Sequence, residues 1–310
     1  MSTAGTVAAL ILIGGVGIGL AALFPPYYAG GSSLSSTTAN LLYNTIRFAG
    51  WAVAALLIAL RRTGVGTWLA VGVTAASLGY YGTNTGYVAR YGAHVAGTGF
   101  WLGQASWVVC AAGTLAGIAA ARYSGVFGAP RRTQPAFPLL VAVGAIAAAV
   151  AYSPGWTHYH LFAATTGRHE DITLGNAFHN PGWVIAANVI ILTVLVVGPV
   201  VVMTLRPSAL AAAALAGLMI PQIANLASEI VVATSPADPR MLGGTSQQLT
   251  RLHETLTVNP TAWFWFEAIA IGALSLLCLA RVLITDPEDT VASPPRRRRR
   301  TKVAPSWHAE

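Results

Sequence analysis

The 310-residue chain is 55% hydrophobic and only 9% charged, and its formal net charge at pH 7 is +8. Soluble globular proteins carry about 25% charged residues, so this chain cannot cover a water-facing surface of ordinary polarity. With two cysteines and no low-complexity bulk, disulfide scaffolds and disordered proteins are excluded as well. The composition therefore predicts a polytopic integral membrane protein embedded in a lipid bilayer.

Apolar windows long enough to cross the hydrocarbon core of a membrane occur eight times along the chain. A crossing needs about 20 residues, and a helix is the state in which a single segment satisfies its own backbone hydrogen bonds. The third and fifth windows are the weakest, because they are short and rich in glycine, alanine and tyrosine. We expect helical spans at 6–24, 41–60, 65–82, 98–121, 137–153, 181–205, 208–233 and 261–283. The predicted fold class is an all-α membrane bundle.

The distribution of basic residues predicts the orientation of this bundle. With eight spans, both termini lie on the same side of the membrane. The first window is counted as a span because it lacks the preceding positive charge that is typical of a cleaved signal peptide. Thirteen of the eighteen basic residues fall on the side of the termini and five on the other. The positive-inside rule then places both termini in the cytoplasm. We expect the protein to lie in the cell membrane.

Much of the positive charge lies in one short segment near the C-terminus. Five arginines, Arg296 to Arg300, stand in a row, and Lys302 follows. Without this segment the chain is close to neutral, so we expect no nucleic-acid partner. The segment 286–310 is instead predicted to be a disordered cytoplasmic tail that contacts anionic lipid headgroups.

Two segments indicate an internal duplication. Residues 44–60 and 176–192 are identical at seven of seventeen positions, including an asparagine, a glycine and a tryptophan. We therefore expect two four-helix halves, 1–133 and 134–285, related by an axis along the membrane normal. Coincidence is the alternative, because alanine, leucine and glycine recur readily in apolar helices.

The two copies differ at one position of a helix face that they are expected to share. Asn44 and Arg47 stand in the first copy where Asn176 and His179 stand in the second. Arginine is a permanent cation, whereas histidine titrates near neutral pH and serves as a general base or a metal ligand. His179 is therefore predicted to be the titrating centre of a functional site.

Polar side chains gather in the halves of the spans that face the outer side. In the seventh span Gln222, Asn225 and Glu229 fall on one helix face, at i, i+3 and i+7. A carboxylate within a span is costly unless it is paired or hydrated, so this face should point into the bundle. Glu267 in the eighth span is a second carboxylate that would be costly without a partner or water. Arg47 is the expected countercharge for Glu229 or Glu267.

Two interpretations of these polar residues remain open. In the first, they form structural ion pairs, and the aromatic residues form a belt at the membrane interface. In the second, they line a site open to the extracytoplasmic face, in which His179, Glu229 and Glu267 are catalytic. The substrate-binding residues of that site would be Asn44, Arg47, Gln104, Asn176, Gln222 and Asn225.

The segment between the fifth and sixth spans carries side chains of the types that can bind metals. His158 and His160 are two residues apart, and the run from Arg168 to Asp171 adds His169 and two carboxylates. Imidazole and carboxylate groups suit zinc, copper or iron, although the spacing matches no fixed ligand motif. We expect His158, His160 and His169 to be the metal ligands. Solvated interfacial histidines are the alternative.

These features favour a membrane-embedded enzyme or a subunit that holds a transition metal, haem or quinone at an outer site. A secondary transporter with an outer vestibule is the alternative, supported by Pro199 and Pro221 within spans. A non-catalytic subunit of a membrane-protein complex is the third class. A retinal Schiff base is excluded, because the only lysine is Lys302 in the tail.

Overall fold

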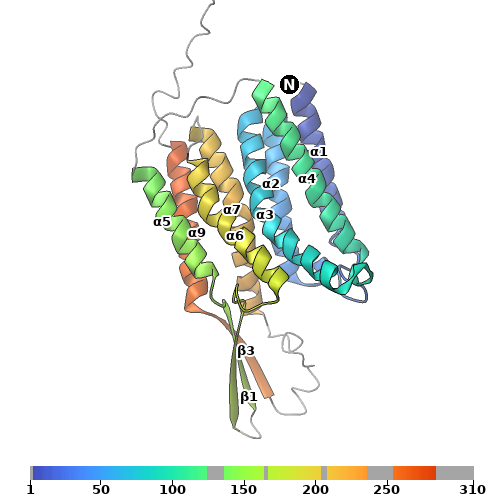
Figure 1. Cartoon of the computed structure of the whole chain (residues 1–310), viewed down its shortest axis with the longest axis vertical. Coiled ribbons are helices and arrows are strands. Elements are labelled where there is room, and N and C mark those ends of the chain that lie inside the picture. The colour runs from blue at the N-terminus through green and yellow to red at the C-terminus, as the bar shows by residue number, and fades with distance from the viewer. Residues whose placement is uncertain (1–2, 124–135, 164–166, 204–207, 236–253, 284–310) are drawn as a thin grey trace, which may run out of the picture.

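The computed structural model describes residues 3–123, 136–163, 167–203, 208–235 and 254–283. The described part is mostly helical, and its helices lie side by side with a small sheet extending from one end (Figure 1). We call that end of the bundle the sheet end. The basic tail at 286–310 lies outside the described residues. Five other arginines used to predict the orientation also lie outside them, namely Arg131, Arg132, Arg206, Arg240 and Arg251.

A helix stands at each of the eight predicted spans. The helices are α1 (Thr3–Ala21), α2 (Thr38–Ala59), α3 (Thr63–Tyr91), α4 (Thr98–Tyr123), α5 (Ala136–Tyr152), α6 (Gly182–Val202), α7 (Ser208–Thr234) and α9 (Ala262–Leu283). Six of them are long and apolar enough to cross a membrane, whereas α5 is shorter and α3 does not belong to that set. Helix α3 continues past its predicted end to Tyr91, where Gly92 stops it with a φ of 94°.

The expectation of an all-α fold is wrong in one respect, because three strands form an antiparallel sheet. Strands β1 (Thr157–Ala163), β2 (Arg168–Leu174) and β3 (Glu254–Pro260) lie in the order β2-β1-β3. Side chains alternate between the two faces of a strand. In β1 this alternation buries Tyr159, which is 2% exposed, while the neighbouring His158 and His160 stay partly exposed.

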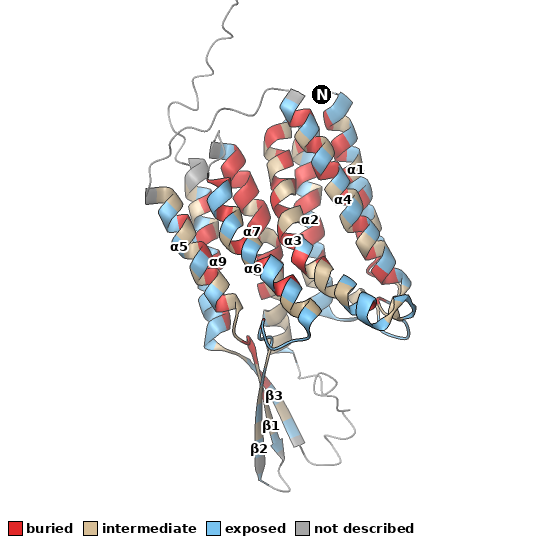
Figure 2. Ribbon diagram, viewed as in Figure 1, coloured by how far each residue is buried: buried red, intermediate tan, exposed pale blue. Residues whose placement is uncertain are grey.

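The helices pack as two groups joined through their inner members. In the first group α1 lies against α2 and α4, and α3 lies against α2 and α4. In the second, α5 lies against α6 and α9, and α7 lies against α6 and α9. Helices α2 and α3 contact α7, and α3 also contacts α6, so the two groups are in contact, and α2, α3 and α7 all carry buried residues (Figure 2).

The repeated segments do not fold alike, which corrects part of the duplication argument. Asn44 and Arg47 lie within α2, whereas Asn176 and His179 precede α6, which begins only at Gly182. Pro181 stands at the N-cap of α6. Proline lacks the N–H that a helix interior requires and favours helix starts. The second copy therefore has no helix face that joins Asn176 and His179.

Helices α3 and α7 approach each other closely through their backbones. A Cβ atom at Gly72 would lie 2.7 Å from the amide nitrogen of Leu218, and it would also clash with the carbonyl oxygen of Ala214. A Cβ atom at Gly217 would lie 3.0 Å from the Cα of Gly72. Small residues allow helix backbones in membranes to approach this closely. The two glycines therefore set the distance between α3 and α7.

The segment between α1 and α2 folds over the sheet end of the first group. Tyr28 forms a β-bridge with Ala96, and the Ala29 amide donates to the Val95 carbonyl at 2.9 Å. The Gly97 amide donates to the Tyr27 carbonyl at 3.0 Å. These backbone bonds fix Tyr27 and Tyr28 against the connection between α3 and α4.

Candidate functional site

A cavity of about 510 Å³ lies among the sheet-end halves of α1, α2, α3 and α7. Its wall combines amides, hydroxyls, one cation and one carboxylate with a set of aromatic rings. The polar and charged members are Asn40, Asn44, Arg47, Thr83, Asn84, Asn225, Ser228 and Glu229. The aromatic members are Tyr27, Tyr28, Tyr43, Phe48, Tyr80 and Tyr81.

Arg47 is the cation of this cavity, and its side chain is held between two aromatic rings. Its Cζ atom lies 4.8 Å from the ring centroid of Tyr43 and 4.6 Å from that of Tyr81. Both distances are within the range of a cation–π attraction. Arg47 is 4% exposed, and its Nε and Nη2 atoms have no hydrogen-bond partner among the described residues. Arg47 lines the cavity, and its guanidinium keeps unused hydrogen-bond donors in this buried position.

The expected ion pair of Arg47 with Glu229 or Glu267 does not form among the described residues. Glu229 accepts a hydrogen bond at its Oε2 from the Thr157 hydroxyl, at 2.9 Å. Glu267 is fully buried, does not line the cavity, and neither of its carboxyl oxygens has a hydrogen-bond partner in the described part. The prediction was wrong because it expected a carboxylate beside the guanidinium, whereas the faces of two tyrosine rings lie there.

The polar face of α7 points into the bundle, as predicted for its sequence pattern. Asn225 and Glu229 line the cavity, and Gln222 lies behind the wall at 2% exposure. The Tyr80 hydroxyl donates to the Gln222 Oε1 atom at 3.0 Å. Gln104 is not part of the cavity wall, and its Nε2 atom is buried without a hydrogen-bond partner among the described residues.

Two tyrosines of the segment between α1 and α2 border the cavity near its sheet end. The Tyr28 hydroxyl donates to the Asn84 Oδ1 atom at 3.1 Å, and the Tyr27 and Tyr28 rings pack edge to face, 5.0 Å apart. Burial raises the pKa of both phenols above its ordinary value. Both therefore remain protonated at neutral pH, and the Tyr28 hydroxyl serves as a hydrogen-bond donor.

His179 and Asn176, predicted as site residues, lie outside the cavity on an exposed turn before α6. The Asn176 Oδ1 atom accepts from the Phe178 amide at 2.9 Å, and the His179 amide donates to the Asn176 carbonyl at 3.4 Å. Neither residue is part of the cavity wall. The structure therefore does not bring His179 together with Glu229 in one site.

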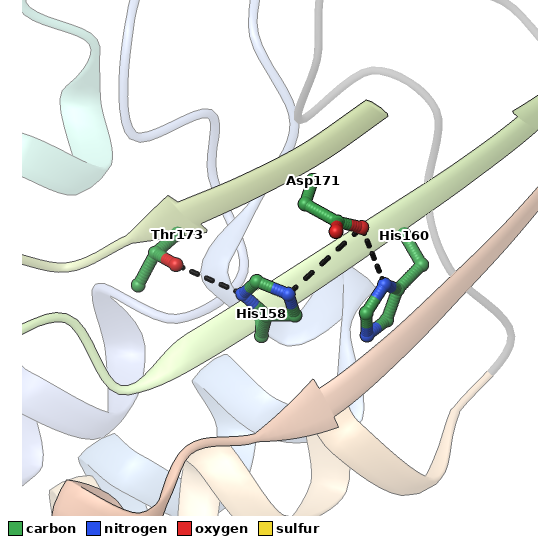
Figure 3. Close-up of polar contacts among 4 residues, drawn as sticks. All are labelled: His158, His160, Asp171 and Thr173. Atoms are coloured by element: carbon green, nitrogen blue, oxygen red, sulfur yellow. Dashed lines mark hydrogen bonds and ion pairs between the residues drawn. The ribbon is translucent and has the colours of Figure 1, made fainter. Parts of the chain in front are cut away.

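A second polar cluster lies on the sheet, outside the helical bundle. His158, His160 and Asp171 place one donor atom each within 4.8 Å of one another (Figure 3). His169 is not a member of this cluster, because its ring lies against Phe162 at a centroid distance of 4.8 Å. The third member of the cluster is therefore Asp171, and not His169 as predicted from the sequence.

Comparison of the chain with protein-family models, with curated proteins and with solved structures finds no match. A fold by itself does not specify function, so the chemistry of the cavity and of the sheet cluster is what indicates the function of this protein.

Proposed function

We propose that this is an integral membrane protein whose eight helices all cross the bilayer and whose cavity binds a small organic anion from the extracytoplasmic side. The observation that carries the proposal is the environment of Arg47. Its charge is buried without a carboxylate partner, and two of its nitrogens lack hydrogen-bond partners among the described residues. An anionic group at this position would accept charge-assisted hydrogen bonds and offset the desolvation of the cation.

The cavity wall also favours a particular kind of anion. Its volume of about 510 Å³ suits a small molecule. The rings of Tyr43, Tyr81 and Phe48 offer contact to an apolar or aromatic body, while the amides of Asn44 and Asn225 supply hydrogen bonds. Glu229 on the same wall would repel a second negative charge. We therefore propose a monoanion that joins a carboxylate to an apolar body.

The groups on this wall favour binding over catalysis. Among the described residues the wall contains no histidine, cysteine or lysine, and the single carboxylate found there, Glu229, is hydrogen-bonded to Thr157. Transport is the second candidate, because the cavity lies between α7 and the first group of helices, and transporters bind substrates between such groups. Uptake of radiolabelled benzoate into proteoliposomes would support transport, and saturable binding without uptake would support a receptor role.

Substitution of Arg47 by glutamine should remove anion binding. A hydrogen bond to a charged group contributes about 1.5–3 kcal/mol, which corresponds to a roughly 10- to 150-fold change in affinity. We expect benzoate to raise the unfolding temperature of the purified protein, and neutral benzamide to leave it unchanged. In the Arg47→Gln variant the benzoate effect should disappear.

Arg90→Gln is the matched control, because Arg90 is exposed near the end of α3 and does not line the cavity. This variant should respond to benzoate as the unmodified protein does. Acetate and phosphate complete the panel of anions. If no anion of the panel raised the unfolding temperature, or if Arg47→Gln kept the full response, the proposal would be wrong.

The proposed orientation places the sheet end outside the cell. Phe178 is exposed between β2 and α6, and Arg62 is exposed between α2 and α3. The connection from β2 to α6 lies at the sheet end, and the connection from α2 to α3 lies at the opposite end (Figure 1). Cys110 and Cys278 are buried. A cysteine introduced at position 178 or at position 62 should therefore dominate labelling by a maleimide that cannot cross membranes. We expect Phe178→Cys to react in intact cells and Arg62→Cys only after permeabilisation. The reverse pattern would invert the topology.

A further inference from the structure

One face of the sheet brings imidazole and carboxylate groups together by strand register. His160 of β1 pairs with Asp171 of β2, and His158 pairs with Thr173. Because paired residues of antiparallel strands project on the same side, all four side chains stand on one face (Figure 3). The fold itself therefore assembles this cluster from residues that are up to 15 positions apart in sequence.

The distances within the cluster centre on one carboxylate oxygen. The Asp171 Oδ1 atom lies 2.5 Å from the Nδ1 atom of His160 and 4.0 Å from the Nε2 atom of His158. The two imidazole rings pack edge to face with their centroids 4.3 Å apart. One nitrogen of each histidine and one oxygen of the aspartate thus converge on the same small volume.

The remaining nitrogen of His158 has a separate partner. Its Nδ1 atom lies 2.8 Å from the Thr173 hydroxyl, which holds the ring so that Nε2 faces Asp171. A histidine that binds a metal through one ring nitrogen typically has its other nitrogen in such a hydrogen bond, which fixes the ring orientation. Thr173 therefore positions a ligand of the same cluster.

From this geometry we propose that His158, His160 and Asp171 bind one divalent transition-metal ion of the zinc type. Two nitrogens and one oxygen suit zinc or copper, whereas calcium and magnesium prefer sites made of oxygen atoms. Tetrahedral zinc at its usual bond lengths separates neighbouring ligand atoms by about 3.3 Å. His160 and Asp171 would move apart and His158 would move closer, by side-chain rotation at a partly exposed surface.

This metal site shares no residue with the cavity wall, so it is independent of the proposed anion binding. Three protein ligands leave a fourth position for a water molecule or for a donor group of another molecule. The metal would join β1 to β2 through their side chains and would therefore stabilise the sheet as well as bind an external group.

Zinc titration of the full-length protein in detergent tests the proposal. The protein should carry an affinity tag without histidines, because a polyhistidine tag binds metal itself. We expect one zinc ion per chain, measured by elemental analysis after dialysis and by competition with a chromogenic chelator. The variants His160→Gln and Asp171→Asn should each lose this ion, and Thr173→Val should weaken its binding about 10- to 100-fold.

His169→Gln is the matched control, because it removes a histidine from the same sheet that lies outside the cluster. This variant should keep the full zinc stoichiometry and affinity. All variants should elute as the unmodified protein does in size-exclusion chromatography, since the substituted side chains are at least partly exposed. The proposal would be overturned if the Asp171→Asn variant bound as much zinc as the unmodified protein. It would also be overturned if His169→Gln lost as much zinc as His160→Gln and Asp171→Asn do.

Discussion

Substitution of Gly72 by valine should prevent the two groups of helices from packing together. The added side chain would meet backbone atoms of α7, namely the Ala214 carbonyl and the Leu218 amide, which cannot rotate away as a flexible side chain would. Overpacking of a tight interior typically costs 1–3 kcal/mol, and a backbone clash belongs at the upper end, about 3 kcal/mol. We expect a lower unfolding temperature and a sharp fall in monodisperse protein.

Gly17→Val is the appropriate control for this prediction. Gly17 is also a helical glycine, in α1, but a Cβ atom there would meet nothing within 4 Å. The variant should therefore unfold within about 0.5 kcal/mol of the unmodified protein, as surface substitutions usually do. Equal stability of the Gly72 and Gly17 variants would show that α3 and α7 do not touch through their backbones.

Replacement of Glu267 by leucine should stabilise the protein. Glu267 is fully buried in α9, and neither carboxyl oxygen has a hydrogen-bond partner among the described residues. An unsatisfied buried polar group costs about 1–3 kcal/mol, and an apolar side chain of similar size removes that cost. We expect the unfolding temperature of Glu267→Leu to rise.

Glu267→Gln distinguishes the effect of the charge of this side chain from the effect of its polarity, because glutamine is uncharged but still polar. The amide is still a polar group without a partner, so this variant should gain little stability compared with Glu267→Leu. A loss of stability in Glu267→Leu would contradict the expectation. It would mean that the carboxyl group is stabilised by a bound ligand or ion, and Glu267 would then belong to a functional site, as the sequence pattern first indicated.

The sequence predicted the helices well and the sheet not at all, for a physical reason. A membrane span is a long apolar window, and each of the eight windows coincides with a helix in the structure. The strands are seven residues each, and their alternation mixes histidine and threonine with apolar residues, which is a much weaker signal. In addition, β3 comes from a segment about ninety residues away from β1, and sequence order does not reveal that pairing.

The candidate site was predictable where it depended on helix periodicity. The face of α7 that carries Asn225 and Glu229 was correctly directed into the bundle, because a 3.6-residue repeat specifies it. The surroundings of Arg47 were not predictable, because Tyr81 reaches it from another helix. Tyr43, at i−4 on the same helix, was a local signal that aromatic faces rather than carboxylates would surround the guanidinium.

The sheet also restricts how α5 and α9 move relative to each other. Strand β1 follows α5 after four residues, and β3 is separated from α9 only by Thr261. The Thr261 hydroxyl donates to the Gly155 carbonyl at 2.9 Å, and β1 and β3 pair along seven residues. A sliding motion of α5 along α9 would break this ladder, and a shift by one residue would turn the buried face of a strand outward. The two helices can therefore tilt relative to each other about the ends that the sheet joins, but they cannot slide past each other.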